Sequence, residues 1–281
     1  MGPLPPAVAT PPVIEVLSEE ASDGFLLRKI MFEPEKDDRV PAYLLIPNVP
    51  ARHRQAVLCL HQTTRVGKAE PAGLAGLPNL HYASELARRG FVALAPDYPN
   101  FGDYKIDVYA RGYVSATMKG IVNHRRAIDI LCAMPAVDRR RVSVIGHSLG
   151  GHNSLFIAAF DTRISSVVTS CGFTSFAKYY GGDLTGWSHP GYMPRIASAY
   201  NKSPAKMPFD FPDVLRAIAP RRLFINAPLH DSNFDVAGVR ECVSQVASDF
   251  PAGCLMVEHP DCTHDFPTET RRRAYNWLER R

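Results

Sequence analysis

Residues 141–151 read RVSVIGHSLGG. The apolar, β-branched start of this stretch predicts a short buried strand, and the apolar residues that follow it predict a helix over 149–160. Between the two lies a Gly-x-Ser-x-Gly motif at residues 146–150. A sharp strand-to-helix turn of this kind exposes the serine hydroxyl beside a helix N-terminus, which favours developing negative charge. Ser148 is therefore predicted to be a nucleophile.

Strand-like and helical segments alternate on both sides of this motif. The strand-like runs lie at 25–32, 42–46, 56–61, 91–98, 141–146, 164–171, 222–227 and 254–259. The helical patterns lie at 79–89, 115–134, 149–160, 211–217, 236–250 and 267–281. This alternation predicts an α/β fold with a mostly parallel central sheet and helices on both faces. In such sheets, ligands bind beyond the carboxyl ends of the strands.

The chain is predicted to form a single domain over 1–281, with a proline-rich N-terminal extension at 1–24. Residues 172–212 break the alternation, and a connection of this length is typical of a lid or binding loop. We expect this aromatic-rich insertion to cap the site; the alternative is a surface excursion that only packs. Its candidate substrate-binding residues are Tyr179, Tyr180, Trp187 and Tyr192.

A serine hydroxyl needs a base to take its proton, and in folds with this turn the partners follow in the order Ser, Asp or Glu, His. His264 follows the last predicted strand, in a loop that ends at Pro267. It is preferred as the base over His259, which lies at the end of that strand, and over His230, which precedes the candidate acid.

The acid must orient the imidazole and stabilise its cationic form. Asp231 lies four residues after the strand at 222–227 and is the preferred candidate. Asp235 is the alternative, although its position suits the cap of the helix that starts near Val236.

Two donors are needed for the negative charge that develops on a substrate carbonyl oxygen. The backbone N–H of Leu149, directly after the nucleophile, is one expected donor. Gln62, in the loop after the strand at 56–61, is the other. His61 is a further candidate for substrate contact; alternatively, it hydrogen-bonds the loop backbone.

With these parts in place, the chain resembles the α/β-hydrolase superfamily. Within it, the chain is similar to dienelactone hydrolase-like proteins, acetyl xylan esterase-like enzymes and the catalytic domain of prolyl oligopeptidase-type peptidases. The resemblance spans about residues 25–281 and lies in LCLHQTT (58–64), APDYPNFGDY (95–104), VSVIGHSLGGH (142–152), IAPRRLFINAPLHDSNFD (218–235) and THDFP (263–267).

There are three departures from these relatives. Dienelactone hydrolase itself uses cysteine where this chain has Ser148, many members have glycine where it has Gln62, and 281 residues leave no room for the large additional domain of the peptidases. The resemblance implies a serine ester hydrolase that forms an acyl-enzyme and needs no metal or organic cofactor. Small acyl, acetyl-sugar and aromatic esters are the expected substrates. An amide or peptide hydrolase and a non-catalytic binding protein of the same fold are the alternatives.

The composition limits the partners. The net charge is +4 with no basic stripe interleaved with aromatics, so nucleic acid is not expected, and no apolar run is long enough to span a membrane. No His-Glu-x-x-His motif indicates metal-assisted hydrolysis. The expected partner is a small-molecule ester, with a homo-oligomer left open.

Six cysteines without a Cys-x-x-Cys pair, and an N-terminus unlike a signal peptide, favour a reducing, cytoplasmic location. Pairing of Cys254 with Cys262 stays open, as does secretion or a periplasmic location after loss of a leader.

Overall fold

The computed structural model describes residues 1–6, 10–49 and 54–280. Within them, one nine-stranded sheet has the order β1-β2-β3-β5-β4-β6-β7-β8-β9. The strands are β1 (Ile14–Ser22), β2 (Phe25–Glu35), β3 (Asp38–Pro47), β4 (Arg54–Leu60), β5 (Val92–Pro96), β6 (Val137–His147), β7 (Ile164–Ser170), β8 (Arg222–Asn226) and β9 (Leu255–Glu258). Strands β1, β2, β3 and β5 pair antiparallel, and every pairing from β5 through β4 to β9 is parallel. The predicted mostly parallel sheet is confirmed.

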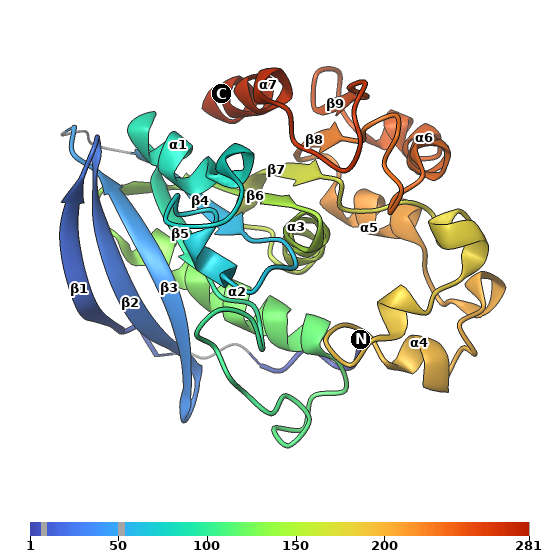
Figure 1. Cartoon of the computed structure of the whole chain (residues 1–281), viewed down its shortest axis with the longest axis horizontal. Helices are drawn as coiled ribbons and strands as arrows, with labels where there is room; N and C mark the ends of the chain where they lie inside the picture. The colour runs from blue at the N-terminus through green and yellow to red at the C-terminus, as the bar shows by residue number, and fades with distance from the viewer. Residues whose placement is uncertain (7–9, 50–53, 281) are drawn as a thin grey trace.

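Helices cover both faces of the sheet (Figure 1). They are α1 (Tyr82–Arg88), α2 (Ala116–Ala133), α3 (Leu149–Phe160), α4 (Arg195–Ser198), α5 (Phe211–Ile218), α6 (Val236–Ser244) and α7 (Thr268–Glu279). Helices α1 and α7 contribute to one apolar core, and α2, α3, α5 and α6 contribute to the other. Strand β4 shows how the sheet separates the two cores: Leu58 and Leu60 enter the larger core, whereas Val57 and Cys59 enter the smaller. Because successive side chains of a strand point to opposite faces, a fully apolar strand is needed between two covered faces.

Several boundaries differ from the sequence-based expectation, three of them near the ends of the chain. The segment 1–24, described from sequence only as an extension, contains strand β1, which pairs with β2 along the edge of the sheet. The helix predicted over 236–250 ends at Ser244, and a short 3-10 turn, Ala247–Asp249, follows. The last helix ends at Glu279; residue 281, the predicted end, lies outside the described residues, as do residues 7–9 of the proline-rich start.

The insertion at 172–212 contains little regular structure. It holds three 3-10 turns, Tyr179–Gly182, Gly186–Ser188 and Pro204–Lys206, and the single-turn helix α4. Figure 1 shows α4 at the right of the view, on the opposite side of the molecule from β1, β2 and β3.

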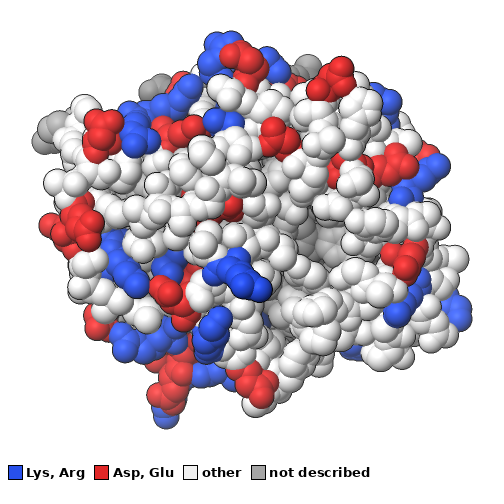
Figure 2. All heavy atoms as spheres, viewed as in Figure 1, with Lys and Arg blue, Asp and Glu red and all other residues white. Residues whose placement is uncertain are grey.

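The surface agrees with the small net charge. Figure 2 shows acidic and basic side chains intermixed on the face viewed, around a hollow whose visible walls are mostly uncharged. Among the described residues, none of the helices combines the length and the apolar character that crossing a membrane would require.

Candidate active site

Ser148 lies between β6 and α3 in a backbone conformation that few residues adopt. Its φ is 53° and its ψ is −118°, whereas residues other than glycine rarely have positive φ. Its N–H donates to the carbonyl of Ser170 at 2.8 Å, and its own carbonyl accepts from the N–H of His152 at 2.9 Å. These two bonds hold the turn in place despite its strain, as expected where strain serves a site.

The glycines of the motif are required by close packing. A Cβ on Gly146 would lie 2.2 Å from the backbone of Gly150, and a Cβ on Gly150 would lie 1.9 Å from the carbonyl oxygen of Leu60. Both distances are far below any contact that a real Cβ makes. The motif therefore lets α3 begin directly against the end of β4.

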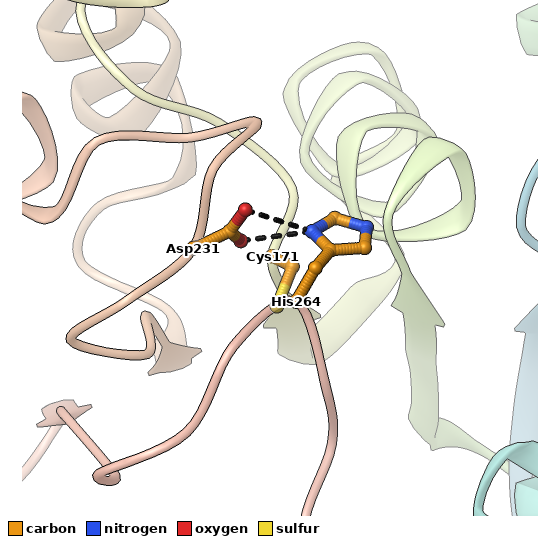
Figure 3. A group of neighbouring side chains, drawn as sticks. All are labelled: Cys171, Asp231 and His264. Atoms are coloured by element: carbon orange, nitrogen blue, oxygen red, sulfur yellow. Dashed lines mark hydrogen bonds and ion pairs between the residues drawn. The ribbon is translucent and has the colours of Figure 1, made fainter.

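Asp231 and His264 meet beyond the ends of β8 and β9. The Nδ1–H of His264 lies 2.9 Å from both carboxylate oxygens of Asp231 (Figure 3). Oδ1 of Asp231 also accepts the N–H groups of Asn233 at 2.8 Å and Phe234 at 3.1 Å. The carboxylate is thus fixed by its own loop, and it orients the imidazole so that the other ring nitrogen, Nε2, faces away from it.

The same loop controls the charge of the acid. Burial by itself acts to raise the pKa of Asp231, because it disfavours the charged form. The hydrogen bond from His264, the charge of that ring, and the N–H groups of Asn233 and Phe234 act in the opposite direction and prevail, so the pKa lies below its ordinary value. The carboxylate is ionised at neutral pH and is suited to stabilise an imidazolium.

The structure engages the alternative residues elsewhere. Asp235 caps α6, and its Oδ1 accepts the N–H of Ala237 at 2.7 Å. Nδ1 of His259 is bonded to the carbonyl of Ala227 at 2.8 Å. His230 is exposed and pairs with Asp261. None of these three side chains is among those that line the cavity at Ser148.

A cavity of about 360 Å³ brings the predicted residues together. Ser148, His264, Leu149 and Gln62 all line it, although Ser148 and His264 share no direct hydrogen bond in this part of the structure. All four predicted aromatic residues of the insertion, Tyr179, Tyr180, Trp187 and Tyr192, line it as well. Residues that the sequence analysis did not single out complete the wall: Thr63, His152, Gly186, Asn233 and Phe234.

Two hydrogen bonds fasten the insertion across this cavity. The hydroxyl of Tyr180 donates to Oδ1 of Asn233 in the acid loop at 2.7 Å. The hydroxyls of Tyr192 and Thr63 are 3.0 Å apart, which links the insertion to the loop after β4. The insertion is therefore attached to two of the loops that border the cavity.

The expectation of a substrate contact for His61 is wrong. Its Nε2 accepts the N–H of Tyr98 at 3.0 Å, so Nδ1 carries the proton and donates to the carbonyl of Gln62 at 2.6 Å. The ring is buried beneath the loop, and burial lowers its pKa. His61 braces the loop backbone, the alternative considered from the sequence.

Gln62 borders the cavity, and its side-chain amide has a hydrogen-bond partner that is not one of the proposed catalytic residues. The Nε2 amide donates to Oε1 of the buried Glu70 at 3.0 Å. This bond engages one of the two amide hydrogens; in folds with this turn, the second oxyanion donor is usually a backbone N–H of this loop. Thr63, the next residue, also borders the cavity. Its position directly after Gln62, in the loop that follows the strand at 56–61, is the sequence feature that could have identified it.

A second histidine, His147, packs against the ring of His264. The two rings have centroids 4.8 Å apart. The amide of Asn226 donates to Oγ of Ser170 at 2.8 Å, and the same Oγ is hydrogen-bonded to Nδ1 of His147 at 2.9 Å. Burial, with a contribution from His264, lowers the pKa of His147 to about 3, so it adds no competing positive charge.

Cys171 lies beside the acid and the base. Its Sγ, a carboxylate oxygen of Asp231 and a ring nitrogen of His264 lie within 4.8 Å of one another (Figure 3), a grouping that suits a metal ion by residue type alone. Both oxygens of Asp231, however, bond the Nδ1–H that such an ion would have to displace. Burial and the Asp231 charge also raise the pKa of the thiol well above its ordinary value, whereas a metal binds the thiolate. These side chains therefore fit a hydrogen-bonded Asp231–His264 pair beside a neutral thiol better than they fit a metal centre.

Known proteins are similar to this chain over all or part of its length. The protein YtaP of Bacillus subtilis (strain 168), described as a hydrolase, is 24% identical over 286 residues, which cover 95% of this chain and 92% of YtaP. Carbohydrate esterase MZ0003, from an unknown prokaryotic organism, is 28% identical over 124 residues, and the match spans 40% of this chain but only 29% of that protein.

Solved structures share the fold at low sequence identity. A glucuronoyl esterase from Solibacter usitatus superimposes with a TM-score of 0.76 at 16% identity, covering 98% of this chain and 87% of its own. An acetyl xylan esterase from Paenibacillus sp. R4 gives 0.71 at 16% identity, covering 95% of this chain and 88% of its own.

A family model described as the alpha/beta hydrolase family matches residues 70–276, a span that contains Ser148, Asp231 and His264. The superfamily inferred from the sequence motifs is confirmed. The chain belongs to the alpha/beta hydrolase family.

Proposed function

We propose that this protein is a serine carboxylic-ester hydrolase that uses Ser148 as nucleophile, His264 as base and Asp231 as acid. One observation carries the proposal above the others. His264 is held through Nδ1 by both oxygens of Asp231, and it lines the same cavity as a serine kept at positive φ. A charged acid, an oriented base and a serine hydroxyl at the cavity are the three parts that acyl transfer needs.

In the first step, Nε2 of His264 takes the hydroxyl proton of Ser148 as Oγ attacks the ester carbonyl. The carbonyl oxygen becomes negative, and the imidazolium is stabilised by the ionised Asp231. When the tetrahedral intermediate collapses, its bond to the alcohol oxygen breaks, and Nε2 returns the proton to the departing alcohol. An ester between the acyl group and Ser148 remains.

In the second step, a water molecule gives a proton to Nε2 as its oxygen attacks the acyl-enzyme. Collapse of this intermediate breaks the bond to Oγ, the proton returns to Ser148, and the carboxylic acid leaves. The oxyanion of both steps would be bound by the backbone N–H of Leu149, at the start of α3, and by a backbone N–H of the loop that contains Gln62 and Thr63.

Ring-bearing substrates suit the walls of this cavity. Four aromatic side chains from the insertion border it, and aromatic rings offer rigid apolar area with polar edges. A larger hollow of about 960 Å³ adjoins it, sharing Thr63, Gly186 and Tyr192, and provides space for a substrate that extends beyond the reacting bond. The names of the similar proteins, glucuronoyl esterase and acetyl xylan esterase, agree with carbohydrate-linked esters.

The proposed function also concerns binding partners and cellular compartment. We expect the protein to bind a small-molecule ester and to bind neither nucleic acid nor a membrane. The cysteines described are all free thiols, which supports a reducing compartment such as the cytoplasm.

The proposal is tested with p-nitrophenyl acetate and a dipeptide p-nitroanilide. The wild-type protein should hydrolyse the ester, and Ser148→Ala should abolish that turnover. The anilide should react far more slowly than the ester. Equal ester rates in Ser148→Ala and wild type would overturn the assignment of Ser148, and faster cleavage of the anilide would identify an amide hydrolase instead.

A further inference from the structure

Two polar side chains in the wall of the cavity lack hydrogen-bond partners. Among the residues that the structure describes, neither ring nitrogen of His152 is bonded, and neither is the indole Nε1 of Trp187. Both residues line the cavity at Ser148, and their side chains are buried, with 1% and 5% of their surface exposed. A buried polar group without a partner is unfavourable and is rare in native proteins, so each such group requires an explanation.

The two residues contact each other in the cavity wall. Their ring centroids are 4.5 Å apart, and the His152 ring also packs against Phe156 at 4.4 Å. His152 lies one helical turn beyond the nucleophile, since its N–H donates to the carbonyl of Ser148. A group held by this pair would therefore belong to the same molecule as an ester held at Ser148.

The chemistry of the pair selects its ligand. The indole N–H only donates, whereas a neutral imidazole donates through one nitrogen and accepts through the other. Burial lowers the pKa of His152 to about 3, so the ring is neutral at pH 7 and offers no charge to a carboxylate or phosphate. A hydroxyl oxygen accepts from the indole, and its hydrogen is donated to the free imidazole nitrogen. A methyl or methylene group satisfies neither ring.

We propose that His152 and Trp187 form a subsite for hydroxyl groups of the substrate, which makes this hydrolase selective for esters of polyhydroxylated, sugar-like rings. This inference rests on the proposed ester hydrolysis and names its substrate class. The hydroxyls belong either to the acid or to the alcohol part of the ester, and the two sources are separated by experiment.

Two matched pairs of esters test the subsite. On the acid side, the methyl ester of a pyranose carboxylic acid is compared with methyl tetrahydropyran-2-carboxylate, which has the same ring without hydroxyls. On the alcohol side, a 6-O-acetyl pyranoside is compared with tetrahydropyran-2-ylmethyl acetate. In each pair, acid release is followed by pH-stat titration, and the ratio of kcat/KM between hydroxylated and deoxy ester is the readout.

The variants are His152→Phe and Trp187→Phe, which keep an aromatic ring and remove the polar atoms. The chain offers matched controls, because His124 and Trp277 are also buried with an unbonded ring nitrogen but do not line the cavity. His124→Phe and Trp277→Phe therefore make the same chemical change away from the site.

Wild type should favour the hydroxylated ester by about tenfold or more in one of the two pairs, because a site built to bond a hydroxyl rejects the analogue that lacks it. His152→Phe and Trp187→Phe should each bring that ratio close to one, and His124→Phe and Trp277→Phe should leave it as in wild type. A wild-type ratio within about twofold in both pairs would overturn the subsite, as would an unchanged ratio in either cavity variant.

An inhibition test on the unaltered protein covers the case of a variant that does not fold. A methyl pyranoside should compete with p-nitrophenyl acetate, and 2-methoxytetrahydropyran should not; equal inhibition by both contradicts the proposal. If wild type hydrolyses p-nitrophenyl acetate through Ser148 but shows no preference for hydroxyls, the subsite alone fails. If it hydrolyses none of the esters, the proposed function itself fails.

Discussion

Both carboxylate oxygens of Asp231 lie 2.9 Å from Nδ1 of His264. One hydrogen serves two acceptors, so the ring is fixed in the tautomer that keeps Nε2 free for the serine. The same carboxylate accepts two backbone N–H groups of its own loop. The loop therefore fixes the position of the carboxylate, and the carboxylate in turn fixes the orientation of the His264 ring.

Asp231→Asn should reduce kcat on p-nitrophenyl acetate by about four orders of magnitude, because an amide at this position no longer fixes the working tautomer of His264. Asp235→Asn is the matched control. Asp235 caps α6, so its change should lower stability slightly and leave kcat within a few-fold of wild type. Steady-state kinetics of both variants decide the point, and a larger loss in Asp235→Asn would reverse the assignment of the acid.

Lys68→Met should lower the free energy of unfolding by about 3–5 kcal/mol, since it leaves a buried carboxylate without its cation. Nζ of Lys68 lies 2.8 Å from Oδ2 of Asp97, and both side chains are almost fully buried. Lys29→Met breaks a partly exposed ion pair with Asp103 and should change the free energy of unfolding by at most about 1 kcal/mol. Urea denaturation measures both, and similar losses in the two variants would contradict the difference in burial.

The buried histidines should make the fold sensitive to acid. Burial lowers the pKa of His124 to about 3, against an ordinary value of 6.5. Between these values the unfolded chain binds the proton that the folded chain excludes, so stability is fully present above pH 6.5 and is lost as pH falls toward 3.

His124→Phe removes one such group. Its free energy of unfolding should therefore fall less steeply than that of wild type between pH 6 and 4, by about 1 kcal/mol per pH unit. Denaturant titrations at several pH values give the two slopes. Parallel slopes would show that His124 takes up its proton in the folded protein as well.

Tyr180→Phe should loosen the insertion, because it removes the hydrogen bond to Asn233 in the acid loop. We expect a rise in KM of about two- to tenfold with kcat nearly unchanged, consistent with the loss of one hydrogen bond. Tyr43→Phe is a suitable control, since Tyr43 lies in β3 and is not among the residues that line the cavity at Ser148 or the adjoining hollow. A fall in kcat without a change in KM would place Tyr180 in the reaction instead of the cap.

The sequence predicts most of the sheet and the helices because their signals are local. Strand β6, the turn at Ser148 and α3 follow one another within one apolar stretch, and the chain order then places Asp231 and His264 in the right loops. Strand β1 was missed because almost all of its residues are exposed and polar ones are frequent, so only pairing with β2 defines it.

Long-range partners explain the remaining differences. His61 ends a strand beside the expected oxyanion loop, but the N–H that engages it comes from Tyr98, 37 positions away. His147 and His152 lie inside or next to the serine motif, yet their roles depend on Ser170 and Trp187, which the fold brings to them. Motif spacing locates the reacting groups, whereas the residues that support them appear only in three dimensions.

The most direct test of the central claim is covalent labelling with a fluorophosphonate, followed by peptide mass spectrometry. An activated serine displaces fluoride from phosphorus, so the wild-type protein should gain one adduct, located on Ser148. The adduct should be absent in Ser148→Ala, and in His264→Ala it should form much more slowly. Equal labelling in wild type and His264→Ala, or an adduct on another residue, would contradict the account.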